Sequence, residues 1–305
     1  MDYDAAVEVF FAPPPPDMPT PDVVAAATPA RRLRDALEPI AMHAVWSRAV
    51  NAALAEHGLN FLTSYVCGRA AALGAVPSSV VAATFAAFEP GLIDQLWTEG
   101  RSHIELDELI AVRDRAAAAS LRHALGAVVG ESDVTRAAQL LEGAVSGADA
   151  TGRVLFAALR SQPQLDDPYG RLWRAADLFR EHRGDSHVAA YVAAGLDPVR
   201  MGVLSETWVG YPVGEYSGTR AWPPPVHAAA VARLEADGLL IDGVLTDRGR
   251  SFRNGIEAAT DTAQDELVGA LGGRLDVLAE ELDGWSKLCV EAGAFPPDLR
   301  KRAAG

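Results

Sequence analysis

Residues 180–187, with the sequence REHRGDSH, concentrate charged and titratable side chains in a chain otherwise dominated by alanine, valine and leucine. Histidine, aspartate and glutamate are residue types that bind metals and transfer protons. Two metal ligands on a helix share a face when they lie four residues apart. Here Gly184 lies between His182 and His187, which are not at that spacing. Because the chain also lacks a glycine-rich phosphate loop, a G-x-S-x-G elbow and an H-E-x-x-H helix, we expect neither a metal nor a cofactor.

The same octet contains the adhesion tripeptide Arg-Gly-Asp. Adhesion requires an exposed extracellular loop, whereas residues 1–16 are acidic before a short apolar run, which is the opposite of a signal peptide. No stretch approaches the roughly 18 uninterrupted apolar residues that span a bilayer. We therefore expect a cytoplasmic protein without a membrane segment, in which the tripeptide has no adhesive role.

Helix signals around the octet favour a structural explanation. Residues 170–183 have the apolar spacing of an amphipathic helix. Gly184 would end that helix, and Asp185 or Ser186 would cap a following one, so the sequence predicts a joint between two helices. Capping does not explain the other charged residues. Either buried ion pairs, or a polar site that anchors a ligand or transfers a proton, would explain Glu181, His182, Arg183 and His187.

Three residues outside the octet are further candidates for ligand contacts. His43 lies on the apolar face of a predicted helix, as a hydrogen-bonded core residue or a ligand contact. Arg69 lies in an alanine-rich segment, and a buried arginine requires a carboxylate, such as Glu89 or Glu181, or an anionic ligand. Tyr65 is one of several aromatic residues that could line a pocket or form plain core. The full set is Trp46, Phe61, Tyr65, Phe85, Phe88, Trp97, Trp173, Phe179, Tyr191, Trp208, Tyr211, Tyr216 and Trp222.

The composition is that of a globular, helix-rich protein. Hydrophobic residues make up 49% and charged residues 22% of the 305 positions, and this length allows two domains. Alanine is the commonest residue, which favours helix. Cys67 and Cys289 are too few for a disulfide framework, so we expect two buried, inert thiols.

Two stretches about half the chain apart resemble each other, which suggests a duplicated domain. They are AVPSSVVAATFAAFEPGLI (75–93) and AWPPPVHAAAVARLEADGLL (221–240), and their alignment places Glu89 on Glu235. In the second copy, a helix over 223–237 is followed by a predicted hairpin and then by a helix that Thr246 is well placed to cap. The hairpin residues are Leu239, Leu240, Val244 and Leu245, with Asp242-Gly243 as the turn. This order is that of a winged helix-turn-helix.

The runs LFREHRGDSHVAAYVAAGL (178–196) and YVCGRAAALGAVPSSVVAATFAAFEPGLI (65–93) resemble the actinobacterial SalK-like, MarR-related family of helix-turn-helix proteins. The similarity covers the chain from about Arg31 to Pro297, including GRVLFAAL (152–159) and LTDRGRSFRNGIE (245–257). The resemblance implies two winged-helix-like halves, arranged as one chain that mimics a MarR dimer. It supplies a fold and little chemistry.

We therefore expect a mainly α protein of two degenerate winged-helix (MarR-like) halves that form a pseudo-dimer, with a very short β-wing in the second half. The N-terminal arm is expected to dock some of its apolar side chains, which are Val7, Val9, Phe10 and Phe11. The expected segments are an arm with a proline-rich linker over 1–29, a first half over 30–130, a helical connector over 131–167, and a second half with C-terminal helices over 168–305.

Charge and the predicted recognition helix both disfavour DNA binding. A formal net charge of −14 and a pI near 4.9 repel a phosphate backbone unless a local basic patch exists. A recognition helix needs side chains such as Arg, Lys, Asn or Gln at base edges. The helix over 223–237 offers only Arg233 as a cation, and His227 is the other polar candidate near its start.

The favoured hypothesis is a protein that binds a small apolar or aromatic ligand between its halves, as a transcription-related regulator with reduced or lost DNA binding. One alternative is an enzyme of secondary metabolism that uses the same cavity, with a His or Glu of the octet as general acid or base. A further alternative is a MarR-like repressor that contacts DNA through His227 and Arg233. A duplicated chain has less need of a partner, so a monomer and a homodimer both remain open.

Overall fold

The fold is mainly helical in a computed structural model that describes residues 1–14, 28–298 and 300–301. The α-helices before residue 168 are α1 (Tyr3–Phe10), α3 (Pro29–Ala41), α4 (His43–Trp46), α5 (Arg48–Ala55), α6 (Phe61–Ala70), α7 (Ser78–Phe85), α8 (Pro90–His103), α9 (Leu106–Leu125), α10 (Glu131–Ser146) and α11 (Val154–Arg160). The later ones are α12 (Pro168–Ala193), α13 (Pro198–Trp208), α14 (Pro224–Ala236), α15 (Asp247–Thr262), α16 (Asp265–Leu271) and α17 (Leu275–Glu291). Short 3₁₀ helices are η1 (Ala71–Leu73), η2 (Ser217–Arg220) and η3 (Gly272–Arg274), and the strands are β1 (Leu240–Ile241) and β2 (Val244–Leu245).

Polar N-cap residues fix the starts of several of these helices. Asp167, for example, accepts hydrogen bonds from the backbone N–H groups of Tyr169 and Gly170, which would otherwise lack partners at the start of α12. Pro168 follows at the first helical position, where its missing N–H costs nothing. The same kind of cap starts other helices: Thr28 for α3, Ser47 for α5, Asn60 for α6, Asp197 for α13 and Thr246 for α15.

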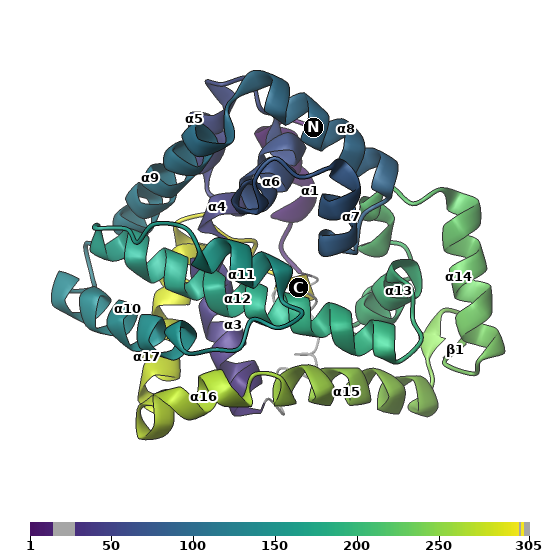
Figure 1. Cartoon of the computed structure of the whole chain (residues 1–305). Coiled ribbons are helices and arrows are strands. Elements are labelled where there is room, and N and C mark those ends of the chain that lie inside the picture. The colour runs from purple at the N-terminus through teal and green to yellow at the C-terminus, as the bar shows by residue number, and fades with distance from the viewer. Residues whose placement is uncertain (15–27, 299, 302–305) are drawn as a thin grey trace.

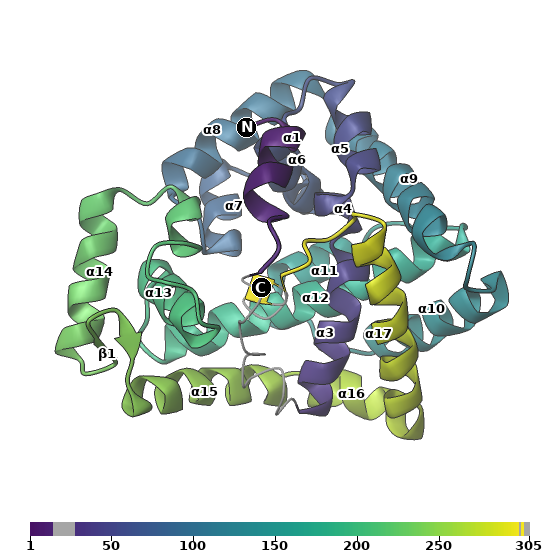
Figure 2. The same ribbon diagram turned by 180° about the vertical axis from the view of Figure 1, so that it is seen from behind.

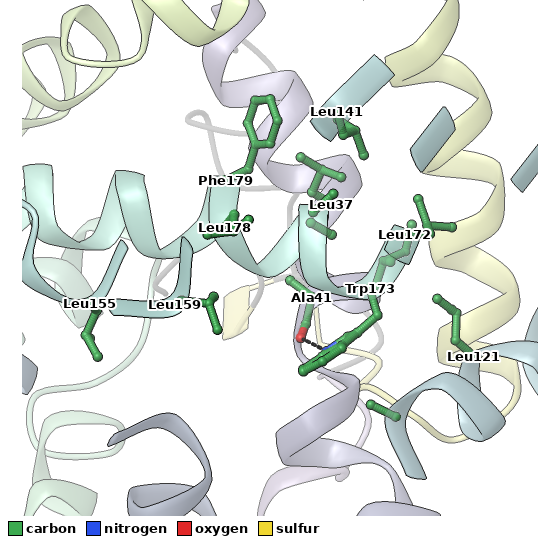
Figure 3. Packing of buried hydrophobic residues seen from close by; sticks show 14 of the residues in the cluster. Leu37, Ala41, Leu121, Leu141, Leu155, Leu159, Leu172, Trp173, Leu178 and Phe179 are labelled. Carbon is green, nitrogen blue, oxygen red and sulfur yellow. Dashed lines mark hydrogen bonds between the residues drawn. The ribbon is translucent and has the colours of Figure 1, made fainter. Parts of the chain in front are cut away.

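Helix α12 runs through the middle of the molecule (Figure 1) and takes part in the two largest hydrophobic cores of the described residues. In the larger core α12 packs against α3, α9, α10 and α11, while α17 packs against α3. Trp173 is fully buried there, and its indole N–H donates to the carbonyl of Ala41 at 3.0 Å (Figure 3). A buried Trp needs such a partner for its N–H, so this bond helps to fix α12 against α3.

The smaller core joins the end of α12 to α13, α14, the hairpin and α15 (Figure 1, right). We call α13 to α15 the hairpin unit. The strands pair antiparallel with Leu240 opposite Leu245, and Asp242 and Gly243 both have positive φ, as a two-residue type I′ turn requires. The predicted turn, the second strand and the cap at Thr246 are confirmed, while the first strand is Leu240–Ile241 and not Leu239-Leu240.

The structure corrects the expected joint at Gly184. Helix α12 continues without a break from Pro168 to Ala193, and the φ angle of Gly184 is not positive. The helix stop is Gly195, which has a φ of +80°. The prediction was wrong because local capping signals were outweighed by tertiary packing, which supplies most of the stability of helices in proteins.

The residues expected to cap a second helix make bonds to another segment instead. The Asp185 carboxylate accepts from the backbone N–H of Phe156 at 3.0 Å and so satisfies the start of α11. The Ser186 hydroxyl donates to the His182 carbonyl at 2.7 Å and accepts from Arg153 Nε at 2.9 Å. Burial raises the pKa of Asp185 to about 6. Both side chains therefore attach α12 to residues 153–156.

The two similar stretches differ in structure beyond their first helical turns. Helix α7 has 8 residues and ends at Ala86 in the left-handed conformation, whereas α14 has 13 residues. Glu89 caps α8 by accepting from the Leu92 N–H, but Glu235 lies in the last turn of α14. No strand lies between α7 and α8, whereas the hairpin of β1 and β2 follows α14.

The N-terminal arm, which contains α1 (Figure 2), packs together with Phe61 at the start of α6 and with Phe295 of the C-terminal segment. Phe10 and Phe11 of the arm contact Trp46, and the Tyr3 hydroxyl donates to the Trp46 carbonyl at 2.6 Å. Val9, in contrast, is 53% exposed. The Lys301 ammonium donates to the carbonyl of Phe10. The proline-rich linker expected in this region lies mostly outside the described residues.

Both cysteines are buried and unpaired, as expected. Among the described helices, none alone has the length and apolarity to cross a membrane; Phe61–Leu73 and Ser78–Phe85 meet those criteria only when taken together, and they are bent by 101° at their junction.

Candidate functional site

A cavity of about 250 Å³, which we call the central cavity, lies between two parts of the chain. Its lining residues are Phe10 of the arm and some of the residues within 38–88 and within 180–301. Its walls come from α6, α7, the turn after α7, α12, α13 and η2. Eight of the thirteen aromatic candidates lie on these walls: Trp46, Phe61, Tyr65, Phe85, Phe88, Tyr191, Tyr216 and Trp222. The others, which are Trp97, Trp173, Phe179, Trp208 and Tyr211, lie in the two cores. The cavity is therefore largely aromatic.

Residues 86–89 of the wall are attached to the second part of the chain by three hydrogen bonds. The Tyr191 hydroxyl donates to the Ala86 carbonyl at 3.0 Å, and the Trp222 indole donates to the Ala87 carbonyl at 2.9 Å. The Glu89 N–H donates to the Arg220 carbonyl at 3.0 Å. These bonds hold the turn after α7 close to η2, which closes this side of the cavity.

Arg69 and Glu181 form a bidentate ion pair at the cavity wall. Arg69 Nε and Nη2 donate to the two Glu181 oxygens at 3.0 and 2.9 Å, so of the two expected partners of Arg69 the structure selects Glu181. Arg69 Nη1 also donates to the Tyr65 hydroxyl at 3.0 Å. Burial alone would raise the pKa of Glu181, but Arg69 and Arg180 outweigh it and lower this pKa to about 2.

Arg180 is a second cation of the same wall and shares Glu181 with Arg69. Its Nη1 lies 2.7 Å from Glu181 Oε1, and its Nε lies 3.6 Å from the carboxylate of Glu38. From Glu38 a series of buried ion pairs continues to α15, through Arg34, Asp35, Arg31 and Glu257. The cavity wall is thus connected electrostatically to the hairpin unit.

Arg220 is the third arginine of the wall. Its guanidinium carbon lies 4.7 Å from the ring centre of Phe88 and 4.6 Å from that of Tyr216. Arg220 takes part in none of the ion pairs of the described residues. Burial favours the neutral phenol of Tyr65, but the charges of Arg69, Arg220 and Arg180 lower the pKa of Tyr65 from its ordinary value. All three guanidinium groups therefore act on the space around this hydroxyl.

His187 lies on the cavity wall with its Nδ1 3.0 Å from the Thr260 hydroxyl. Burial, reinforced by the charge of Arg253, lowers the pKa of His187 to about 3. The imidazole is therefore neutral near pH 7, where it can exchange hydrogen bonds but is a weak base.

Arg183 points away from the central cavity into a buried network with α15. It donates to Glu257 and, at 2.8 Å, to Asp261. Glu257 also binds Arg31 at 2.6 Å and Arg253 at 2.9 Å. Burial would raise the pKa of Glu257, but the three arginines lower it far below its ordinary value. Buried ion pairing thus accounts for Arg183.

His182 and His43 do not line the central cavity. His182 Nδ1 lies 2.8 Å from Gln264 Nε2, and its ring packs edge-on against Phe156. His43 Nδ1 donates to the Pro39 carbonyl at 2.9 Å. Burial lowers the pKa of both histidines to about 4. Within the described part of the chain no three His, Cys, Asp or Glu side chains are grouped as a metal site requires.

The two residues considered for DNA contacts have partners within the protein. His227 Nε2 lies 2.7 Å from the Ser217 hydroxyl, which in turn donates to the buried carboxylate of Glu206. Arg233 is exposed on α14 and pairs with Asp237 at 3.1 Å. His227 is therefore turned toward η2, and Arg233 has an acid beside it.

Three of the candidates predicted from the sequence, Tyr65, Arg69 and His187, line one cavity, and Glu181 pairs with Arg69. Arg220 was not predicted as a site residue, and no role there was predicted for Arg180. A signal for Arg220 exists, since it lies between Tyr216 and Trp222 in a loop with few other charges. That signal is weak without the fold, because Phe88, its other aromatic neighbour, comes from a distant segment.

A family model described as "Helix-turn-helix family" matches residues 30–296 of the chain. No curated protein and no solved structure matches the chain.

Proposed function

Because the chain belongs to this helix-turn-helix family, we propose that it is a small-molecule-binding protein of winged-helix type, related to regulators of the SalK-like and MarR-related kind. The observation that carries the proposal is the central cavity, which has many aromatic side chains and a few polar groups on its walls. Sites for small organic molecules have this composition.

The proposal assigns ligand contacts to Tyr65, Arg69 and His187, which lie on the wall. Glu181 is given a positioning role, because it holds Arg69 and Arg180 from behind. His43, His182 and Arg183 receive no ligand contact. We favour ligand binding over an enzyme in which Glu181 or His187 transfers a proton. Their pKa values of about 2 and about 3 are poorly matched to proton transfer near pH 7.

We further propose that DNA binding by the hairpin unit is reduced. Helix α14 has the place of a recognition helix before the hairpin, and Arg233 is its only cation. The adjacent Asp237 competes with a phosphate for that guanidinium, and the net charge of −14 opposes approach to DNA. A regulator that acts through a protein partner or through a few remaining DNA contacts fits these properties.

Filling the cavity tests the ligand proposal. Gly184 is helical, lies on the wall, and a Cβ there would meet only Glu181 Oε2 at 3.7 Å. Gly184→Phe should therefore place a ring in the cavity without distorting α12. Gly143→Phe is the matched control, since Gly143 is also a helical glycine and has no atom within 4 Å of a Cβ.

Native mass spectrometry of freshly purified protein should show a small molecule that is retained by the wild type and Gly143→Phe and is lost from Gly184→Phe. Equal retention by both variants would place the molecule elsewhere. A wild-type protein that retains nothing and also fails to bind any added aromatic compound would contradict the proposal.

A further inference from the structure

We propose that the molecule bound in the central cavity is an aromatic organic anion, and that Arg220 binds its acidic group. The inference rests on the proposed function and adds the chemical class of the ligand. It follows from the charge balance of the wall, the surroundings of Arg220 and the size of the cavity.

The charge balance leaves Arg220 as the uncompensated guanidinium. Arg69 and Arg180 share the carboxylate of Glu181, and Arg180 also lies 3.6 Å from Glu38. No ion pair within residues 1–14, 28–298 and 300–301 includes Arg220. Arg220 is partly buried beside aromatic surface, and a cation there attracts an anion more strongly than a cation in open solvent does. Arg180 also pairs with Asp177 at 3.8 Å, so a negative charge on the ligand would supply the acidic partner that Arg220 lacks among the described residues.

The surroundings of Arg220 leave its hydrogen-bonding edge available. Phe88 and Tyr216 contact the guanidinium through their rings, at 4.7 and 4.6 Å, and rings of this kind stack on a guanidinium without using its N–H groups. No side-chain N–H of Arg220 donates to another described residue. A guanidinium in this state presents the planar fork that binds a carboxylate in a bidentate manner.

The loop that carries Arg220 is held in place before any ligand binds. The buried carboxylate of Glu206 accepts from the backbone N–H groups of Gly214, Tyr216 and Ser217, at 2.8, 3.0 and 2.7 Å. The Arg220 carbonyl accepts from Glu89. Ordering this loop therefore costs little on binding, which favours affinity.

Lys301 is the other cation on the wall outside the ion pairs described above, and it is a weaker candidate. Its ammonium donates to the Phe10 carbonyl, and burial lowers its pKa from the ordinary value. The cavity volume of about 250 Å³ corresponds to roughly eight waters at ~30 Å³ each. This space suits an acid with one or two rings, its ring system among the aromatic walls and its acidic group at Arg220.

A pair of probes that differ only in charge tests the assignment. The probes are 2-naphthoate and 2-acetonaphthone, in which a neutral methyl ketone replaces the carboxylate of the same ring system. Titration calorimetry on the full chain should give binding of 2-naphthoate about tenfold or more tighter than binding of the ketone, which is the usual size of a charge-assisted interaction.

Arg220→Gln should remove this preference while leaving the affinity for the ketone within about twofold, so the ketone also reports that the variant is folded. Arg220→Lys should retain part of the preference, and Arg250→Gln, an exposed position on α15, should retain all of it.

Equal affinity of the two probes for the wild type, or an equal loss of both in Arg220→Gln, would overturn the anion assignment and leave the ligand-binding proposal intact. Failure of both probes to bind the wild type would count against both proposals.

Discussion

Arg69 and Glu181 form two hydrogen bonds of 3.0 and 2.9 Å across 112 residues of sequence, and this pair joins α6 to α12 at the wall of the central cavity. Removing one partner of a buried ion pair leaves the other charge without compensation, which typically costs about 3–5 kcal/mol. We expect Arg69→Met to lower the free energy of unfolding by an amount in this range, measured by urea denaturation.

The double variant Arg69→Met, Glu181→Leu should recover part of that loss, because it removes both charges. Lys287→Gln, which breaks an exposed pair with Asp283, is the control and should cost at most about 1 kcal/mol. A single variant at Arg69 that is as mild as the Lys287 control would show that this pair contributes little.

The continuous helix predicts opposite effects of alanine at two glycines of the same region. Gly184 is helical, so Gly184→Ala should raise the free energy of unfolding by about 0.5–1 kcal/mol. Gly195 ends the helix with a φ of +80°, so Gly195→Ala should be destabilising although no atom lies within 4 Å of a Cβ there. Thermal melts of the two variants distinguish the signs, and a destabilising Gly184→Ala would restore the idea of a joint.

His43 makes a specific contribution to the pH dependence of stability. Burial lowers its folded-state pKa to about 4, below the ordinary value of 6.5, so the unfolded chain binds the proton more readily. Its stabilising contribution is complete above pH 6.5 and is lost as the pH falls from 6.5 toward 4. From pH 7 to pH 5 the wild type should lose about 2 kcal/mol more than His43→Gln.

Urea denaturation of both proteins at the two pH values gives this difference directly. His182 and His187 have lowered pKa values and act in the same direction, whereas Asp177 and Asp185, whose pKa values burial raises to about 6, act in the opposite one. Because these groups are common to both proteins, the comparison isolates His43. Parallel pH profiles would contradict the prediction, because they would mean that folding does not lower the pKa of His43.

The reduced-DNA-binding proposal predicts weak salt dependence. Each phosphate that a protein neutralises steepens the fall of affinity with salt. Because α14 exposes one cation that already pairs with Asp237, a labelled duplex titrated at about 50 and 200 mM salt should bind weakly, with a shallow slope. Tight binding that falls by several hundredfold over this range would favour the repressor alternative.

The hairpin unit could be predicted from the sequence because its signals are local. Asp242-Gly243 fixes a turn, and Thr246 caps the next helix through a bond to a residue three positions away. The structure of the octet could not be predicted in this way. Asp185 caps α11, which is distant in sequence, and not a helix next to itself, so its partner is known only from the fold. The sequence predicted that Arg69 needs a carboxylate partner, and Glu181 was one of the two candidates. The stacking of Arg220 on Phe88 could not be predicted, because it depends on contacts between distant segments.

Helix α12 belongs to the two largest hydrophobic cores of the described residues, through Trp173 and Phe179 in one and Tyr191 in the other. If one core unfolded, α12 would lose part of the packing that stabilises it, and the other core depends on the same helix. We therefore expect the two cores to unfold together. The molecule then unfolds as one cooperative unit despite its length, with a calorimetric enthalpy close to the van't Hoff value.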